Sequence, residues 1–214
     1  MKKDDTKQLI TDRALELFAE RGYDAVSVGD IAAAVGIKAP SLYNHFVGKE
    51  AIFNAIVQDV ADRYEQDTDK KHIHVQDVAQ DVASMHGITA KQLRDKLRWI
   101  FCYSLHDNRV RLFRKLMTRE QFRSSEIAQL YTKRYVDRMV AYHADIFRSL
   151  IASGEIVAVD PDALAAMYVA PINQLLGVCD RDPRQEELCL QRLDCHVKTF
   201  FALIHGETHK NDGE

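Results

Sequence analysis

The chain has 214 residues, of which 46% are hydrophobic, and its formal net charge is −3. This length allows one large or two modest domains, and the composition supports a hydrophobic core. No apolar run reaches the ~18 residues of a membrane span, and the N-terminus lacks the apolar stretch of a signal peptide. We therefore expect a cytoplasmic protein that does not contact a membrane.

The first predicted helix runs from Thr6 to Arg21, where apolar residues recur at helical spacing among charged ones. Gly22 follows this helix and is expected to end it. The positions that we expect on its buried face are Ile10, Ala14, Leu17 and Phe18.

A short second helix is predicted from Val28 to Val35. Ser27 stands where this helix needs an N-cap, and Asp30 is an acidic partner three residues later. Gly36 can take the left-handed conformation that ends a helix. The signals at both ends of the segment therefore agree on one short helix.

A third helix is predicted to open at Ala39 and to run through Phe46, with Pro40 in the first turn, where its missing N–H is not needed. Two helices this short need another helix beneath them to form a core. The arrangement is the helix-turn-helix pattern, whose second helix lies in the DNA major groove. A further helix, at residues 49–66, completes the unit.

Two stretches of this region resemble the DNA-binding signature of TetR/AcrR-type transcriptional repressors. They are L-F-A-E-R-G-Y-D-A-V-S-V-G-D-I-A-A-A-V-G-I (17–37) and A-P-S-L-Y-N-H-F-V-G-K-E (39–50). The resemblance implies an all-α fold with a three-helix helix-turn-helix DNA-binding domain at 1–48 and a connecting helix at 49–66. It further implies a helical effector-binding and dimerisation domain at 67–205 and a polar tail at 206–214. The implied function is a repressor that a small-molecule effector releases from a palindromic operator.

Four residues are expected to contact DNA phosphates. The resemblance implies this role for Tyr43 and His45. Lys49 opens a helix, where its ammonium can meet a phosphate near the positive end of the helix dipole. Ser27 can cap its helix and touch a phosphate at the same time. The alternatives are that Tyr43 packs in the core and that Lys49 is a solvated surface lysine.

Five more residues lie where DNA would be reached. Lys38 and Ser41 are expected to contact the backbone, while Ala39, Pro40 and Asn44 are placed at base edges. Alanine and proline offer only apolar contacts, for instance to a thymine methyl group.

One departure from the family pattern affects specificity. Many relatives carry a basic residue near the start of the second helix, where this chain has Val28 and Gly29. Readout of guanine by arginine is therefore unsupported, and part of the specificity is expected to come from DNA shape.

The charge is unevenly distributed along the chain. Residues 1–66 carry 8 Lys/Arg and 11 Asp/Glu, yet residues 36–49 contain two lysines, one histidine and no acid. We expect a locally positive DNA face on an acidic module. Residues 91–148 carry 14 Lys/Arg and 6 Asp/Glu. Their basic cluster at 109–123 is interpreted as a solvated face, with attraction of an anionic effector or of DNA as the alternatives.

The C-terminal half is predicted to be helical throughout. Thr89 and Gln92 form a capping-box pattern, and Ser124 or Ser125 is expected to cap a long helix that runs to Ser153 and is ended by Gly154. The last two helices, at 161–178 and 183–204, carry wide apolar stripes, with Pro171 inside the first of them. We expect these two helices to form a homodimeric four-helix interface. Phe200 and Leu193 are the interface candidates, and burial within one subunit is the alternative.

Aromatic side chains and methionines between residues 93 and 176 predict an effector cavity between helices. Ordinary core packing is the alternative for each of them. Asn173 would be a polar group in an apolar helix, so it either anchors a ligand or faces solvent or the partner subunit. The predicted effector-binding residues are Trp99, Tyr103, Phe113, Met117, Tyr135, Met139, Tyr142, Met167 and Asn173.

Catalysis and metal binding have little support in the sequence. The four cysteines form no C-x-x-C pair, so reduced thiols are expected. His72 and His74 lack the helix-spaced partners of a metal motif, and no phosphate loop or dinucleotide fingerprint occurs. We expect no enzyme, no metal and no cofactor. A TetR-like protein-binding adaptor that has lost DNA binding is the main alternative.

Overall fold

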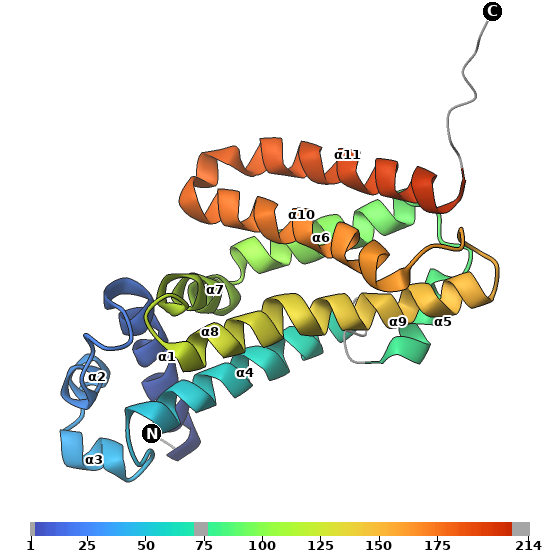
Figure 1. Ribbon diagram of the computed structural model, residues 1–214. Helices are drawn as coiled ribbons and strands as arrows, with labels where there is room; N and C mark the ends of the chain where they lie inside the picture. Colours follow the sequence, from blue (N-terminus) through green and yellow to red (C-terminus); the bar gives the residue numbers. More distant parts are fainter. Residues whose placement is uncertain (1–2, 71–76, 207–214) are drawn as a thin grey trace, which may run out of the picture. The chain divides into compact units, whose positions relative to one another are not determined.

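The computed structural model describes residues 3–70 and 77–206, and this part of the chain is helical with no strand (Figure 1). The all-α fold class predicted from the sequence is confirmed. The α-helices are α1 (Lys3–Arg21), α2 (Val28–Val35), α3 (Ala39–Tyr43), α4 (Lys49–Asp69), α5 (Val78–Met85), α6 (Ala90–His106), α7 (Asn108–Glu120), α8 (Ser125–Thr132), α9 (Arg138–Ala152), α10 (Pro161–Arg181) and α11 (Glu186–Ile204). A π-helical turn (Lys133–Asp137) precedes α9, and a 3₁₀ turn (Pro183–Gln185) precedes α11.

The chain divides into two compact units. The first contains residues 1–66 and 106–131, and the second contains residues 67–105 and the chain from 132 onward. The sequence prediction places residues 106–131 in a C-terminal domain of residues 67–205. The structure instead packs α7 against α1 within the first unit.

Helix α1 packs against both α2 and α7, so two of its sides are covered. Ile10, Ala14 and Phe18 are fully buried, as predicted. Leu15 is also buried, whereas the predicted Leu17 is only half-buried. The buried stripe is wider than one amphipathic face because the helix has two neighbours.

Apolar and charged side chains together hold α7 in the first unit. Phe113, Leu116 and Met117 of α7 are completely buried. Arg109, whose side chain is 13% exposed, pairs with Asp12 of α1 and, at 2.6 Å, with Asp59 of α4. Burial lowers the pKa of the Arg109 guanidinium.

The interpretation of the 109–123 cluster as a solvated face is therefore wrong for two of its members. Arg109 lies between two carboxylates, and Arg114 is only 7% exposed. Their partners and covering side chains come from other helices of the folded unit. The spacing of the charged residues within the cluster gives no information about these partners.

Arg119, near the C-terminal end of α7, binds the end of another helix. Its guanidinium donates hydrogen bonds to the carbonyl oxygens of Glu20, at 2.7 Å, and Arg21, at 3.1 Å. These are carbonyls of the last turn of α1, which have no partner within the helix. Arg119 thus caps α1 immediately before the chain turns at Gly22, whose φ is 96°.

The second unit has an aromatic core shared by α9, α10 and α11. The Tyr168 ring lies 5.6 Å from that of Phe147 and 5.0 Å from that of Phe200, measured between centroids. Leu193 and Phe200 are 0% and 3% exposed within this unit. The prediction that these two residues form the dimer interface was therefore wrong, because their stripe on α11 faces the core.

The long helix predicted to follow a cap at Ser124 or Ser125 is present from Ser125 to Ala152, with the π turn inside it. Gly154, at φ 76°, follows its end, as expected. The side-chain amide of Asn173 on α10 donates a hydrogen bond of 2.9 Å to the Tyr135 carbonyl in the π turn. Helix α10 continues through Pro171 and packs against α9. Because Asn173 bonds to the π turn, Pro171, two residues earlier, lies near this turn.

Helix α10 is the one described helix that is long and apolar enough, by length and composition, to cross a membrane. The sequence prediction of no such segment missed it. Leu164, Ala165, Tyr168 and Val169 of this helix belong to the core of the second unit. Packing within that core accounts for the apolar character of α10.

Candidate nucleic-acid interface

Helix α2 begins at the predicted capping box. Ser27 Oγ accepts a hydrogen bond of 3.1 Å from the Asp30 N–H, and the Ser27 N–H donates one of 2.8 Å to the Asp30 carboxylate. Hydrogen bonds from the Ser27 hydroxyl and N–H lower the pKa of Asp30. The box satisfies backbone groups that the first turn leaves without partners.

The turn between α2 and α3 is fixed by Gly36. This residue has a left-handed φ of 78°, and its N–H donates to the Ala33 carbonyl at 3.1 Å. The Ile37 N–H donates to the Ala32 carbonyl at 3.0 Å. This pair of bonds is the Schellman pattern, which ends α2 and sets the direction in which the chain leaves it.

Helix α3 is shorter than predicted, since it ends at Tyr43 instead of running through Phe46. The His45 N–H donates to the Leu42 carbonyl at 2.9 Å, so the chain tightens into an i to i+3 turn. Leu42 and Phe46 are 0% and 5% exposed and anchor this segment to the core.

In contrast to this anchor, most of the predicted DNA-contacting side chains are exposed. Tyr43 is 54% exposed, which excludes the alternative that it is a core residue. Ala39 and His45 are half-buried, and the Nδ1 atom of His45 is buried without a hydrogen-bond partner among the described residues. The remaining exposed members of the predicted set are Ser27, Lys38, Pro40, Ser41 and Asn44.

This surface has the chemistry of a DNA contact. The ammonium and hydroxyl groups of Lys38, Ser41 and Tyr43 are donors suited to phosphate oxygens, and no acid lies between Gly36 and Lys49. Val47, which the sequence reasoning passed over, is 90% exposed four residues after the end of α3. An apolar side chain exposed at this point can meet a thymine methyl group.

Lys49 has an intramolecular partner. Its Nζ donates a hydrogen bond of 2.9 Å to the Tyr23 carbonyl and lies 4.4 Å from the centroid of the Tyr23 ring. The ring also packs against Phe18 and Phe53, and burial raises the pKa of the Tyr23 hydroxyl. Lys49 therefore ties the start of α4 to the loop before α2, with two of its three donors left to meet a phosphate.

The predicted effector residues do not gather in one unit. Phe113 and Met117 belong to the first unit, and the other seven belong to the second. Trp99 and Tyr103 stack at 5.2 Å, and the Tyr103 hydroxyl donates to Asp67 at 2.9 Å. Met167 is 57% exposed.

A buried polar pair lies near the remaining aromatic residues. The Tyr142 hydroxyl donates to the carboxylate of Asp81, which is 7% exposed. Burial and this hydrogen bond raise the pKa of Tyr142, and burial lowers the pKa of the neighbouring His143. Each of these groups is satisfied by protein partners, as buried polar atoms require.

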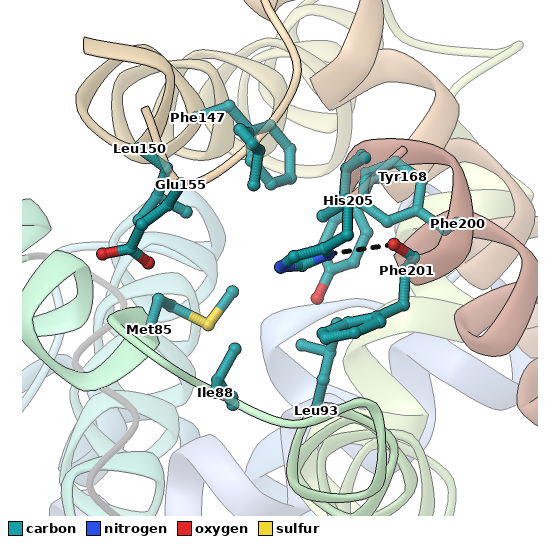
Figure 2. Close-up of a pocket in the computed structure, with 12 residues that line it drawn as sticks. Met85, Ile88, Leu93, Phe147, Leu150, Glu155, Tyr168, Phe200, Phe201 and His205 are labelled. Carbon is teal, nitrogen blue, oxygen red and sulfur yellow. Dashed lines mark hydrogen bonds between the residues drawn. The ribbon is translucent and has the colours of Figure 1, made fainter. Parts of the chain in front are cut away.

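The second unit contains a small cavity of about 10 Å³, which is room for about one water molecule. Figure 2 shows the Glu155 carboxylate and the His205 ring among apolar side chains, with His205 hydrogen-bonded to the Phe201 carbonyl at 2.9 Å. None of the predicted effector residues lines it. The lining residues are Met85, Ile88, Leu93, Phe147, Leu150, Glu155, Ile156, Tyr168, Phe200, Phe201, Ile204 and His205.

Two histidines considered as metal ligands, His72 and His74, lie outside the described residues. Among residues 3–70 and 77–206 no group of three or more metal-ligating side chains occurs. The predicted tail at 206–214 also lies outside the described residues, apart from Gly206.

The capped α2, the glycine turn and the exposed face of α3 define a helix-turn-helix domain of the DNA-binding class. Residues 10–56 match the family described as bacterial regulatory proteins, tetR family. This N-terminal segment therefore resembles the TetR family, and the resemblance predicted from the sequence is confirmed over these residues.

Curated relatives match over the same segment. The chain is 43% identical over 53 residues to the HTH-type transcriptional repressor ComR of Escherichia coli K12, covering 25% of each chain. It is 46% identical over 52 residues to IcaR of Staphylococcus aureus Newman, a negative regulator of the biofilm operon icaADBC, covering 24% of this chain and 28% of IcaR. These matches thus span only about a quarter of the length of the relatives.

Solved structures match over nearly the whole chain. The SmeT–triclosan complex has a TM-score of 0.69 at 20% identity, covering 92% of this chain and 90% of SmeT. NalD, the secondary repressor of the MexAB-OprM multidrug efflux pump of Pseudomonas aeruginosa, has a TM-score of 0.67 at 19% identity, covering 96% and 98%. At this identity the likeness establishes the fold: an N-terminal helix-turn-helix domain followed by a helical C-terminal domain.

Proposed function

We propose that the chain is a transcriptional repressor that binds a palindromic operator as a homodimer and leaves it when a small-molecule effector binds. The observation that carries the proposal is the α3 face, where donors without a neighbouring acid stand exposed on a rigidly capped helix-turn-helix. The repressor names of ComR, IcaR and NalD support the direction of regulation.

The dimer is proposed to form through the outer faces of α10 and α11. On α10, the exposed residues Ala163, Ala166, Met167, Ala170 and Gln174 follow one helical stripe. On α11, Leu188 and Leu203 are 40% and 50% exposed. A C2 dimer presents two identical DNA domains, which requires a palindromic site. Sedimentation as a monomer at micromolar concentration would contradict this part of the proposal.

Operator binding is tested by selection from a randomised duplex pool, followed by fluorescence anisotropy. We expect an inverted repeat to be enriched and to bind at least about 10³-fold more tightly than a scrambled duplex. If the chain enriches no sequence, or binds every duplex with the same salt-dependent affinity, operator binding is contradicted. That outcome would favour the alternative from the sequence analysis, a protein-binding adaptor.

The effector is proposed to be mostly apolar or aromatic and to contact the predicted residues of the second unit except Met167, which lies on the exposed stripe of α10. The triclosan bound to SmeT supports an aromatic ligand for a protein of this fold. Asn173 and Tyr135, which meet at the π turn, supply a polar contact beside Pro171. A ligand can release DNA only if it binds the DNA-incompetent state more tightly.

Calorimetry with and without bound operator tests the coupling. Because allosteric coupling is reciprocal, the operator must weaken effector binding by the same factor by which the effector weakens operator binding. A typical coupling of about 1–3 kcal/mol corresponds to roughly 5- to 150-fold. Equal effector affinities in the two titrations would exclude release by this route while leaving operator binding itself intact.

A further inference from the structure

Two other helices of the first unit hold the connection between α1 and α2. Arg119 of α7 donates hydrogen bonds from Nη1 to the Glu20 carbonyl at 2.7 Å and from Nη2 to the Arg21 carbonyl at 3.1 Å. Two positions further along the chain, the Tyr23 carbonyl accepts the 2.9 Å hydrogen bond from Lys49 of α4. Anchors therefore lie on both sides of the position at which α1 ends.

A buried carboxylate keeps the Arg119 guanidinium in place. Glu120 is 1% exposed, and its Oε1 lies 3.5 Å from Arg119 Nε without a hydrogen-bond partner among the described residues. A buried carboxylate oxygen of this kind is costly unless a cation stays close to it. Arg119 thus faces Glu120 with Nε and the end of α1 with its two terminal nitrogens, so its orientation is fixed from both sides.

The lack of a side chain at Gly22 permits this close approach. A Cβ there would lie 2.9 Å from Glu120 Oε1 and 3.6 Å from Arg119 Nη2. Glycine is the residue that allows a backbone to come so near to other groups. The residue at this position and the placement of α7 therefore depend on each other.

The chain between this anchor and the DNA-facing helices has little slack. Ser27, the N-cap of α2, follows Gly22 by five positions. Between them, Val26 is 1% exposed and the Tyr23 ring lies 5.3 Å from that of Phe53, measured between centroids. Close-packed segments transmit a displacement instead of absorbing it. A shift at the end of α1 would therefore move α2, and α3 with it, since α2 contacts both α1 and α3.

We propose that Arg119 is a positioning residue for operator binding, an inference that rests on the proposed function. From α7 it fixes the end of α1 and thereby the orientation of α2 and α3, without touching DNA itself. Without this anchor, only a fraction of the molecules present the helix-turn-helix in the binding orientation. The apparent operator affinity falls by that fraction, although no residue of the DNA face has changed.

The first test is an operator titration of the full chain by fluorescence anisotropy at several salt concentrations. Arg119→Ala should weaken operator binding by about tenfold. The slope of log affinity against log salt should stay unchanged, because no phosphate contact is lost. Unchanged affinity would overturn the proposal. A slope that falls by about 1 would also overturn it, because Arg119 would then be a phosphate contact.

Arg123→Ala is the matched control. Its guanidinium is 61% exposed and lies 3.9 Å from the same Glu120 oxygen, and among the described residues it donates to neither carbonyl of α1. It carries the same charge as Arg119, so its loss should leave operator affinity nearly unchanged. An equal loss of affinity in both variants would show that local charge, and not the anchor, matters.

The second test needs no DNA. Hydrogen exchange of the free protein should be faster in Arg119→Ala than in the wild type at the amides of residues 28–37, and unchanged at those of α9 in the second unit. Unchanged exchange at residues 28–37, or an equal increase along the whole chain, would overturn the proposal. If the wild type binds no operator, the proposed function fails, and this measurement still decides whether Arg119 positions α2.

Arg119→Lys replaces the alanine variant if that variant does not fold. Lysine keeps the charge and the aliphatic stem but lacks the planar fork that reaches two carbonyls at once. The same pattern is expected with a smaller loss of affinity. Wild-type affinity and wild-type exchange in this variant would overturn the proposal.

Discussion

The ammonium of Lys49 donates a hydrogen bond to the carbonyl of Tyr23 and lies over the ring of the same residue. One contact thus joins the first residue of α4 to the loop that precedes α2. The sequence suggested Lys49 as a phosphate ligand, and the structure adds a second role within the protein. The two roles can be separated by experiment, because they affect different measurements.

Lys49→Ala should weaken binding to all DNA sequences about equally and reduce the salt slope by about 1. It should also lower the free energy of unfolding by about 1 kcal/mol, because it removes a hydrogen bond and a cation–π contact. Tyr43→Phe is the matched variant, since the exposed hydroxyl of Tyr43 should affect DNA affinity and leave stability unchanged. Anisotropy titrations and urea unfolding measure the two effects. A changed base preference at constant affinity would contradict the phosphate assignment.

Ser27→Ala should lower the free energy of unfolding by about 1 kcal/mol at pH 7, because it removes the N-cap of α2. The pKa of Asp30 is depressed in the folded state by Ser27, so the stability gained from this ionised carboxylate is present above its unfolded pKa. That contribution is lost as the pH falls through the lower, folded pKa. The difference between wild type and Ser27→Ala in urea unfolding should therefore shrink between pH 5 and pH 3. A difference that grows as the pH falls would contradict the sign.

Arg109→Ala should destabilise the first unit, since it removes the buried cation between Asp12 and the half-buried Asp59 and leaves Asp59 with Arg63 alone. We expect a loss of about 2 kcal/mol, below the 3–5 kcal/mol of a fully buried pair because Asp12 is 40% exposed and Asp59 keeps its pair with Arg63. Arg13→Ala removes an exposed pair with Glu16 and should cost less than about 1 kcal/mol. Equal losses for the two variants would show that α7 is not held by Arg109.

Gly22→Ala should destabilise the first unit more than Gly36→Ala does. Both glycines have a left-handed φ, of 96° and 78°, so both substitutions carry a backbone cost of about 1 kcal/mol. A Cβ at Gly22 would lie 2.9 Å from Glu120 Oε1, whereas a Cβ at Gly36 meets nothing within 4 Å. Thermal unfolding of both variants measures the difference. If Gly36→Ala lowers the melting temperature more than Gly22→Ala does, the close approach of Glu120 does not restrict the side chain at position 22.

Structural features that depend on residues a few positions apart were predictable from the sequence. The capping boxes at Ser27 and at Thr89, and the glycine that ends α2, involve partners at most four positions away. The exposed positions of α3 followed from the same local pattern, because Leu42 and Phe46 had to face the core. The exposed positions of this segment were accordingly predictable, whereas their contact with DNA stays a prediction.

Contacts between distant segments were not predictable. Arg119 reaches the Glu20 carbonyl across 99 positions, and a single sequence gives no sign of such a pairing. The stripe containing Leu193 and Phe200 was identified correctly as apolar. Periodicity shows that such a stripe is buried, but it cannot tell whether the neighbour is the same subunit or a second one.

The attachment of α7 to α1 has a consequence for how the protein is made. The first unit, which carries the proposed DNA-binding face, is discontinuous in sequence, because residues 106–131 complete a structure that begins at the N-terminus. On the ribosome, residues 1–66 emerge first. The side of α1 that is covered by Phe113, Met117 and Arg119 becomes buried only after these three residues have emerged. Closing this long loop is an entropic cost that slows folding. A shortened chain that ends after α4 would therefore be a poor substitute for the first unit, even though it contains every residue of the TetR-family match.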